Sequence, residues 1–339
     1  MSLSVPVPPI HKVLKVPIAP IDTLGRRFVS LRLSMTARCN FACQYCVPDK
    51  TRLVAAKDEL QAEEYAYLLE LLMHFGIRKL RITGGEPLLS SQLIPFLQKI
   101  AHLPLTDKAL TSNGTLLESR LPALIAAGVK RLNISLDSLD PETFKRISRG
   151  GKIEQTLSGI ESGIESGLKI RINMVVTKGM NDHEILPMLE FCAARNLELR
   201  FIELMQMGHL KGSALWGRQL FTQPQILSLI GNRYPIVEAS AERSATAKRW
   251  YIPALDSHFG IIANTSAPFC AQCDRLRVTS NGFLYGCISS DRGVALRPLL
   301  GMGKSQALEQ LQQMLEHALT AKSQHSFAGS KMRMKFLGG

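Results

Sequence analysis

Residues 31–48 read LRLSMTARCNFACQYCVP, a strand-like segment followed at once by a loop with three cysteines, Cys39, Cys43 and Cys46. Apolar and polar residues alternate up to Ser34, which predicts that the loop begins where a β-strand ends. Three thiolates on one short loop can bind three irons of a cubane iron–sulfur cluster and leave the fourth iron open. A zinc site completed by a histidine from elsewhere is less favoured, because structural zinc sites usually need four ligands.

The same alternation of strands and helices continues through the first two-thirds of the chain. Helical stripes of apolar residues lie between the strands, for example at Leu68, Leu71, Leu72 and Phe75. Six such units predict a parallel sheet with helical crossovers, either an open doubly wound sheet or a partial (β/α) barrel. The predicted strands are Phe28–Ser34, Lys79–Thr83, Asp107–Leu110, Arg131–Leu136, Lys169–Val176 and Leu197–Glu203.

The pattern changes after about residue 220. Strand-like pieces at 248–252 and 259–263 precede RLRVTSNGFLYGC, in which Asn281-Gly282 is a strong hairpin signal, and residues 304–320 have a helical pattern. We therefore divide the chain into an irregular, proline-rich N-terminal arm (1–24), an α/β unit (25–220) and a smaller C-terminal region (221–339).

The seven cysteines are clustered. Six of them form two groups of three, and the second group is Cys270, Cys273 and Cys287. In a cytoplasmic chain such clusters indicate metal ligands rather than disulfides. A zinc ribbon would need a second CxxC or a histidine near Cys287, and neither is present. Cys192, in a predicted helix, is expected to be a buried structural thiol.

The net charge is +13, which suits a polyanionic partner. The Lys and Arg residues are spread along the sequence without a block, so a small phosphate ester is favoured over nucleic acid. No apolar run reaches 18 residues and no signal-peptide layout is present, so we expect a cytoplasmic protein without a membrane partner.

The first cysteine loop, with Tyr45 before its third cysteine, resembles that of the radical S-adenosylmethionine superfamily. Three further elements stand where that superfamily has them, each at the C-terminal end of a predicted strand: GGEP (84–87), TSNG (111–114) and SLD (135–137). Active sites of α/β barrels are built at these strand ends. The resemblance implies an S-adenosylmethionine that chelates the open iron and yields a 5′-deoxyadenosyl radical.

The second cysteine group, followed by Arg275 and Arg277, gives the closer resemblance, to the GTP 3′,8-cyclase family of molybdenum cofactor (molybdopterin) biosynthesis. It covers residues 25–339, and its carrying segments include LRITGGEPLL, RLNISLDSLDPETF, LRFIELMQMG and the final Gly338-Gly339. The implied fold is an incomplete (β/α)6 TIM-type barrel with a smaller C-terminal α+β region that carries a second cluster. The implied cofactors are two [4Fe-4S] clusters and S-adenosyl-L-methionine.

The implied reaction is that of a lyase that converts GTP to (8S)-3′,8-cyclo-7,8-dihydroguanosine 5′-triphosphate. The adenosyl radical would take the ribose 3′ hydrogen, and the carbon radical would attack C8 of guanine. Guanine would coordinate the open iron of the second cluster. An external one-electron reductant is needed, and the sequence leaves open whether the protein forms a homodimer.

The resemblance also assigns roles to individual residues. Arg171 stands where the family has Lys, and Ala37 and Gln206 also depart from the family pattern. The metal ligands would be Cys39, Cys43, Cys46, Cys270, Cys273 and Cys287. The S-adenosylmethionine contacts would be Tyr45, Gly85, Glu86, Ser135, Asn173 and Met205. The GTP contacts would be Arg32, Lys79, Arg81, Thr111, Arg171, Arg200, Arg275 and Arg277. The catalytic set would be Arg32, Arg275, Arg277, Gly338 and Gly339.

Two other readings stay open at this level. A peptide-modifying radical enzyme with two clusters would usually carry more cysteines in a longer C-terminal extension. A non-enzymatic zinc-binding or nucleic-acid-binding protein would hold tightly bound zinc and no iron.

Overall fold

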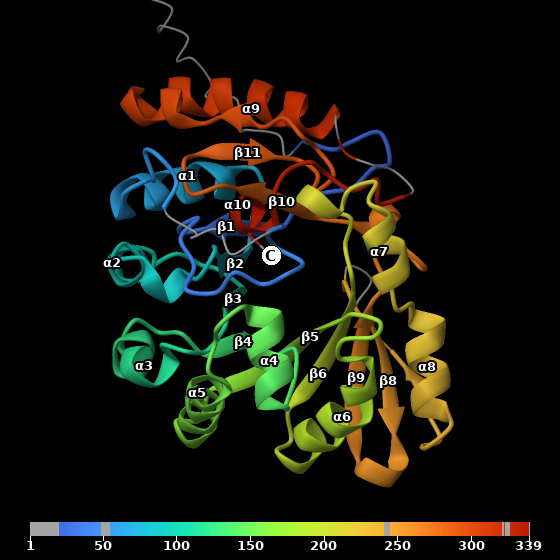
Figure 1. Ribbon diagram of the computed structural model, residues 1–339. Coiled ribbons are helices and arrows are strands. Elements are labelled where there is room, and N and C mark those ends of the chain that lie inside the picture. The colour runs from blue at the N-terminus through green and yellow to red at the C-terminus, as the bar shows by residue number, and fades with distance from the viewer. Residues whose placement is uncertain (1–19, 49–54, 241–244, 321, 323–325, 339) are drawn as a thin grey trace, which may run out of the picture.

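A twelve-stranded sheet, bent into an arc with helices on its outer side, organises the chain (Figure 1). The computed structural model describes residues 20–48, 55–240, 245–320, 322 and 326–338, so most of the N-terminal arm lies outside the described residues. The central strands are β1 (Ser30–Ser34), β2 (Lys79–Thr83), β3 (Asp107–Ser112), β4 (Arg131–Ser135), β5 (Lys169–Val176) and β6 (Glu198–Glu203).

These six strands are parallel and neighbour one another in sequence order. A doubly wound sheet reverses its strand order at a switch point, whereas a barrel does not. The sequential order therefore decides for the incomplete barrel. The crossover helices are α1 (Ala62–His74), α2 (Leu93–Lys99), α3 (Leu117–Ala126), α4 (Pro141–Ser148), α5 (Ile153–Glu165) and α6 (Ile185–Ala194).

Strands from the C-terminal third extend both edges of this sheet. β10 (Arg275–Val278) pairs in parallel with β1, and β9 (Ser257–Ile262) pairs in parallel with β6. The second cysteine group, which flanks β10, is thereby carried to the first strand of the barrel. The remaining strands are β7 (Val237–Ala239), β8 (Lys248–Ile252), β11 (Phe283–Tyr285) and β12 (Val294–Ala295), and the remaining helices are α7 (Ala214–Gln219), α8 (Gln223–Gly231), α9 (Lys304–Thr320) and α10 (Met334–Leu337).

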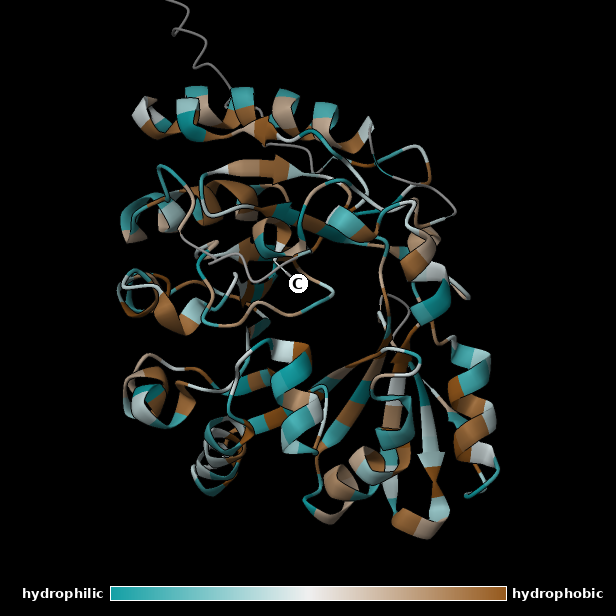
Figure 2. Cartoon of the chain, viewed as in Figure 1, coloured by the Kyte–Doolittle hydropathy of each residue, from teal (hydrophilic) through white to brown (hydrophobic). Residues whose placement is uncertain are grey.

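The two faces of the sheet differ in character because side chains alternate along each strand. Leu80 and Ile82 of β2 are fully buried and belong to the large apolar core shared with the helices. Arg81, between them, belongs to the other face. Figure 2 shows the same division on α9, which turns brown apolar residues toward β11 and teal polar residues outward. A barrel interior is usually filled by branched apolar side chains, so a polar interior indicates a binding site.

Candidate active site between two cysteine groups

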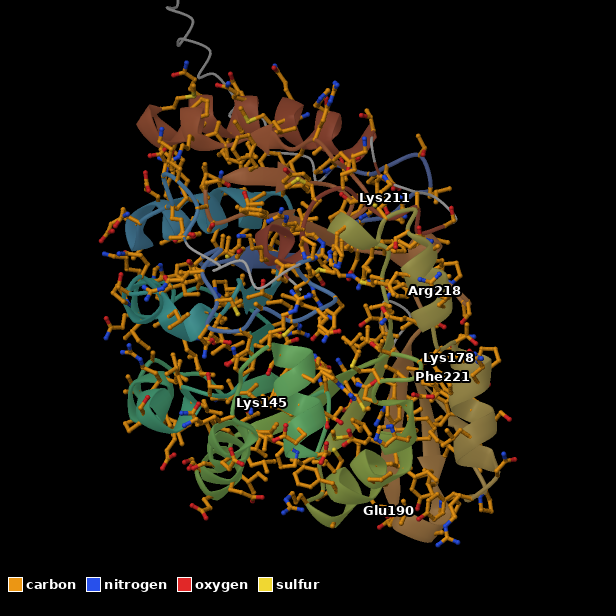
Figure 3. The ribbon with its side chains drawn as sticks, in the orientation of Figure 1. Lys145, Lys178, Glu190, Lys211, Arg218 and Phe221 are labelled. Carbon is orange, nitrogen blue, oxygen red and sulfur yellow. The ribbon has the colours of Figure 1, made fainter. Side chains whose placement is uncertain are left out.

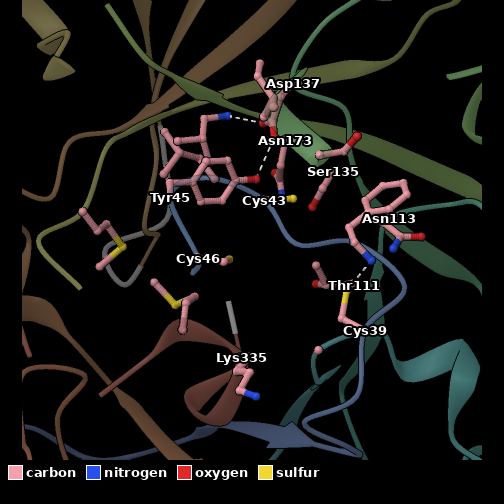
Figure 4. A pocket seen from close by; sticks show the side chains of 18 of the residues that line it. Cys39, Cys43, Tyr45, Cys46, Thr111, Asn113, Ser135, Asp137, Asn173 and Lys335 are labelled. Atoms are coloured by element: carbon pink, nitrogen blue, oxygen red, sulfur yellow. Dashed lines mark hydrogen bonds between the residues drawn. The ribbon is translucent and has the colours of Figure 1, made fainter. Parts of the chain in front are cut away.

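The first cysteine group lines a cavity of about 200 Å³ at the C-terminal ends of the parallel strands. Figure 4 shows Cys39, Cys43 and Cys46 around this cavity, with Tyr45 beside them and Lys335 of α10 at its border. The three thiols come from one loop after β1. Polar side chains from the ends of β3, β4 and β5 line the same cavity. A local sequence pattern cannot predict that these separate segments lie together.

Backbone hydrogen bonds between the cysteine loop and the GGEP turn fix this geometry. The Gly85 amide donates to the Thr36 carbonyl at 2.6 Å, and the Glu86 amide donates to the Arg38 carbonyl at 2.7 Å. The Glu86 carboxylate accepts from the Ser112 hydroxyl at 2.8 Å and from the Asn113 amide at 2.7 Å. The buried Glu86 side chain thus joins the turn after β2 to the end of β3, and burial raises its pKa to about 7.

We expect Gly85→Ala to disrupt this site. A Cβ at position 85 would lie 2.3 Å from the Arg38 carbonyl oxygen, so the GGEP turn and the cysteine loop must move apart. Overpacking of this kind costs about 1–3 kcal/mol, and here the shift falls on the cysteine loop itself. The measurement is iron content after anaerobic reconstitution, which should fall to about half. Gly217→Ala in α7, where a Cβ meets nothing within 4 Å, is the control and should retain full iron.

The first cavity has the properties that a cubane cluster and a polar ligand require. Within the described residues, no three His, Cys, Asp or Glu side chains lie close enough to hold a single metal ion. The thiols instead line the cavity from separate positions, as a cubane needs, because each of its irons takes its own thiolate. Burial raises the pKa of Cys39 to about 11 and that of Cys46 to about 12, so these thiols ionise only with a cationic partner such as iron.

Unsatisfied buried polar atoms in the same cavity point to an absent ligand. Thr83 Oγ1 and Asn173 Oδ1 line it, are buried and have no hydrogen-bond partner in the described part of the chain. Buried polar atoms normally have a hydrogen-bond partner, so these two oxygens without one fit a ligand that brings its own donors. Tyr45 is already engaged, since its hydroxyl donates to Asp137 at 2.6 Å (Figure 4).

The second cysteine group lines a cavity of about 120 Å³ beside the first. Arg275 and Arg277 of β10 and Arg32 of β1 lie on its wall with the three thiols. Burial raises the pKa of the Cys273 thiol, but the charges of Arg275 and Lys322 outweigh burial and lower it to about 7. The two cysteine groups therefore differ in electrostatic surroundings, since cations surround the second.

The two cavities share part of their walls. Ile202, Met205 and Met334 line both, so the two cavities adjoin at apolar side chains from the end of β6 and from α10. A molecule bound at the second group would thus lie next to one bound at the first. This adjacency is what a radical reaction needs, because reactive intermediates must form beside their substrate and away from water.

Deeper in the barrel, arginines and two carboxylates form an ion-pair network. Asp107 accepts from Arg81 at 2.6 Å and from Arg131 at 2.5 Å. Glu198 accepts from Arg171 at 3.0 Å and from Arg200 at 2.8 Å. Four guanidinium groups against two carboxylates leave a net positive interior. Arginine forks of this kind suit phosphate oxygens.

Other basic side chains lie on the outer surface. Figure 3 labels Lys145 of α4, Lys178 and Arg218 of α7, all of which are exposed. The positive net charge is therefore divided between the surface and the barrel interior.

The C-terminal tail enters the barrel. Arg277 donates to the carbonyls of Leu337 at 3.1 Å and of Gly338 at 2.8 Å, and Arg32 also donates to Gly338 at 3.3 Å. A Cβ on Gly338 would overlap Thr83 Oγ1, and its φ of 72° lies in the left-handed region. Glycine at position 338 is thus required by both space and backbone conformation. Gly339 lies outside the described residues.

Comparison with known proteins agrees with this arrangement. The profile of the Radical SAM superfamily matches residues 33–192, and that of Molybdenum Cofactor Synthesis C matches residues 197–328. The GTP 3′,8-cyclase of Sulfurovum sp. (strain NBC37-1) is 39% identical over 86% of this chain and 89% of its own. That of Ectopseudomonas mendocina (strain ymp) is 36% identical over 91% and 93%. The chain belongs to the GTP 3′,8-cyclase family.

The fold likeness extends to a more distant solved structure. Streptococcus suis SuiB, crystallised with the precursor peptide SuiA, has a TM-score of 0.59 to this chain at 16% identity. The match covers 78% of this chain and 61% of SuiB, and at this identity it shows the fold alone. The resemblance to the cyclase family and the incomplete barrel, both expected from sequence, are confirmed. No helix in the described ranges has the length and apolar character needed to span a membrane.

Most of the residues that the family resemblance singles out line one of the two cavities in this cyclase-family structure. Glu86 lies behind the first cavity, in the hydrogen-bond network of its loop. On the first cavity are Cys39, Cys43, Tyr45, Cys46, Gly85, Thr111, Ser135, Asn173 and Met205. On the second are Arg32, Met205, Cys270, Cys273, Arg275, Arg277 and Cys287. The walls of these two cavities do not include Lys79, Arg81, Arg171 or Arg200.

Sequence reasoning missed several polar residues of the interior. Arg131 lies two residues before Asn133 and four before Ser135 on β4, so strand alternation was a signal that could have placed it on the interior face. Asp107 and Glu198 carried the same signal at the starts of β3 and β6. Lys322 carried none, because its contacts lie 36 to 49 residues earlier in the chain.

Proposed function

We propose that this protein converts GTP to (8S)-3′,8-cyclo-7,8-dihydroguanosine 5′-triphosphate, the first step of molybdenum cofactor biosynthesis. The observation that carries the proposal is the shared wall between two cavities, each lined by three cysteines. A radical chemistry site and a substrate site joined in this way fit a reaction that starts with hydrogen abstraction and ends in ring closure. The membership of the cyclase family supports the choice of GTP.

In the first cavity, Cys39, Cys43 and Cys46 would hold a [4Fe-4S] cluster. Bound there together with S-adenosylmethionine, the cluster would supply the radical chemistry that removes the ribose 3′ hydrogen of GTP. The unpaired oxygens of Thr83 and Asn173 orient the ligand's donors. Met205, which lines both cavities, would present an apolar surface where they adjoin. An external one-electron reductant supplies the electron, and we place the reaction in the cytoplasm.

In the second cavity, Cys270, Cys273 and Cys287 would hold the second [4Fe-4S] cluster, and the guanine of GTP would bind beside it. Arg32 and Arg277 position the nucleotide. In the free chain both donate to the Gly338 carbonyl, so the tail completes the wall on which GTP rests.

The triphosphate is bound by the interior arginines. Arg81, Arg171 and Arg200 already pair with Asp107 or Glu198, which holds their guanidinium groups in fixed directions before substrate arrives. Arg81 Nη1 is buried and has no hydrogen-bond partner in the described part of the chain, so its N–H can donate to a phosphate oxygen. Arg171, where the family has Lys, offers two directed donors in place of a point charge.

The test uses reduced, anaerobically reconstituted protein with S-adenosylmethionine, with and without GTP. We expect about eight irons per chain and formation of 5′-deoxyadenosine that depends on GTP, together with a cyclised nucleotide. Formation of 5′-deoxyadenosine at the same rate without GTP would contradict the substrate assignment while leaving the radical chemistry intact. Tightly bound zinc without iron would contradict both.

A further inference from the structure

Lys322 occupies an unusual position for a lysine. Its side chain is buried, with 7% of its surface exposed, and it lies on the wall of the second cavity. Its Nζ donates to the Arg275 carbonyl at 2.9 Å, to the Gly286 carbonyl at 2.8 Å and to Cys273 Sγ at 3.4 Å. It also lies 4.9 Å from the centre of the Phe28 ring. One ammonium group thus connects β10, the residue before Cys287 and a cluster thiol.

These contacts exclude a role as a direct substrate ligand. A lysine ammonium has three N–H donors, and the three acceptors named above use all of them. Lys322 therefore has no proton left for a phosphate or a guanine oxygen. What it can do is fix the relative positions of Cys273 and the chain segment that leads into Cys287.

The charge of Lys322 also indicates a role at Cys273 and Cys287. A buried ammonium is costly unless an anion compensates it. Among the described residues, the acceptors of Nζ are two backbone carbonyls and one thiol, so the compensating charge would come from Cys273 and, nearby, Cys287. The lysine and a thiolate-ligated cluster would stabilise each other.

We propose that Lys322 is a positioning residue for the second iron–sulfur cluster. It holds Cys273 through an ammonium–thiolate hydrogen bond and raises the reduction potential of the cluster. The inference rests on the proposed function, because it requires a cluster at this group. Its physical basis is that hydrogen bonds to cluster sulfurs and nearby positive charge stabilise the reduced, more negative cluster. The first cysteine group makes no such hydrogen bond to a lysine within the described residues.

The experiment uses the full-length chain with Cys39, Cys43 and Cys46 replaced by alanine, so that only the second cluster contributes a signal. In this background we compare Lys322, Lys322→Met and Lys322→Arg by iron content and by a redox titration followed by electron paramagnetic resonance. Lys322→Met should lower the ratio of reduced to oxidised cluster at a fixed potential at least about tenfold, equal to about 59 mV for one electron. Lys322→Arg should restore most of this shift.

Lys108→Met is the matched control. Lys108 is half-buried in β3 and also donates to a backbone carbonyl, that of Ala127, but it touches neither cysteine group. The potential of the cluster should not change in this variant. If Lys322→Met fails to fold, Lys322→Gln replaces it, since the amide keeps donors for the carbonyls without the charge.

The possible results distinguish failure of the role proposed for Lys322 from failure of the proposed function. A neutral variant that holds its cluster at an unchanged potential overturns the role of Lys322 and leaves the proposed function intact. Failure of both neutral variants to fold as cluster-free chains, judged by far-ultraviolet circular dichroism, makes Lys322 a structural residue and also overturns it. A chain with Lys322 intact that binds no iron at the second group overturns both.

Discussion

Cys273→Ala should abolish formation of the cyclised nucleotide and leave cleavage of S-adenosylmethionine in place. Cys273 lies on the second cavity only, where Arg275 and Lys322 lower its pKa to about 7 and favour the thiolate that iron needs. Without this ligand the iron content should fall from about eight to about four per chain. We expect 5′-deoxyadenosine to form slowly and independently of GTP, measured by liquid chromatography of the reduced, reconstituted variant.

Two further variants complete this test. Cys43→Ala should also lower iron to about four per chain, but it should produce no 5′-deoxyadenosine, because it removes a ligand of the first group. Cys192→Ala should retain about eight irons and full product formation, since Cys192 is buried in α6 and lies on neither cavity. Loss of 5′-deoxyadenosine in Cys273→Ala would contradict the division of labour between the two groups.

Arg277→Ala should weaken GTP binding about 10- to 100-fold while iron content stays unchanged. Arg277 is buried, and hydrogen bonds from a charged donor contribute about 1.5–3 kcal/mol each. The same side chain anchors Leu337 and Gly338, so kcat should fall together with the rise in KM. Steady-state kinetics with GTP varied, alongside iron analysis, measure both effects.

Arg195→Ala is the matched control for charge. Arg195 pairs with Glu161 on the outer side of the barrel and touches neither cavity, so its loss should leave KM and kcat unchanged. Arg277→Lys keeps the charge but loses the planar fork, and should lie between wild type and Arg277→Ala. A loss of iron equal to the loss of GTP binding would show that Arg277 is structural rather than a substrate ligand.

Local patterns predicted most elements of the fold because strand alternation and helical stripes act over a few residues. β2, β5, β8 and α9 have the predicted bounds, and β3 is two residues longer, through Ser112, where its inward-facing polar residues gave no apolar signal. The extension of the sheet by C-terminal strands could not be predicted from local patterns. The pairing of β10 with β1 joins residues about 245 positions apart, and nothing in either segment specifies that partner.

In the candidate site, too, local features could be predicted from the sequence and long-range contacts could not. The cysteines and GGEP are contiguous in sequence and were found from it, and the family resemblance supplied the arginines. The carboxylate partners of these arginines depend on strand register, which decides that Asp107 faces both Arg81 and Arg131. Lys322 depends on a return of the chain after α9 to β10, so only the folded structure brings it to Cys273.

The most direct test of the proposed reaction follows the ribose 3′ hydrogen atom of GTP. GTP deuterated at the ribose 3′ carbon is incubated with the reduced, reconstituted protein and S-adenosylmethionine, and the 5′-deoxyadenosine is analysed by mass spectrometry. We predict one deuterium in 5′-deoxyadenosine and a cyclised nucleotide that has lost its 3′ deuterium. Unlabelled 5′-deoxyadenosine, with the deuterium still on the nucleotide, would contradict it.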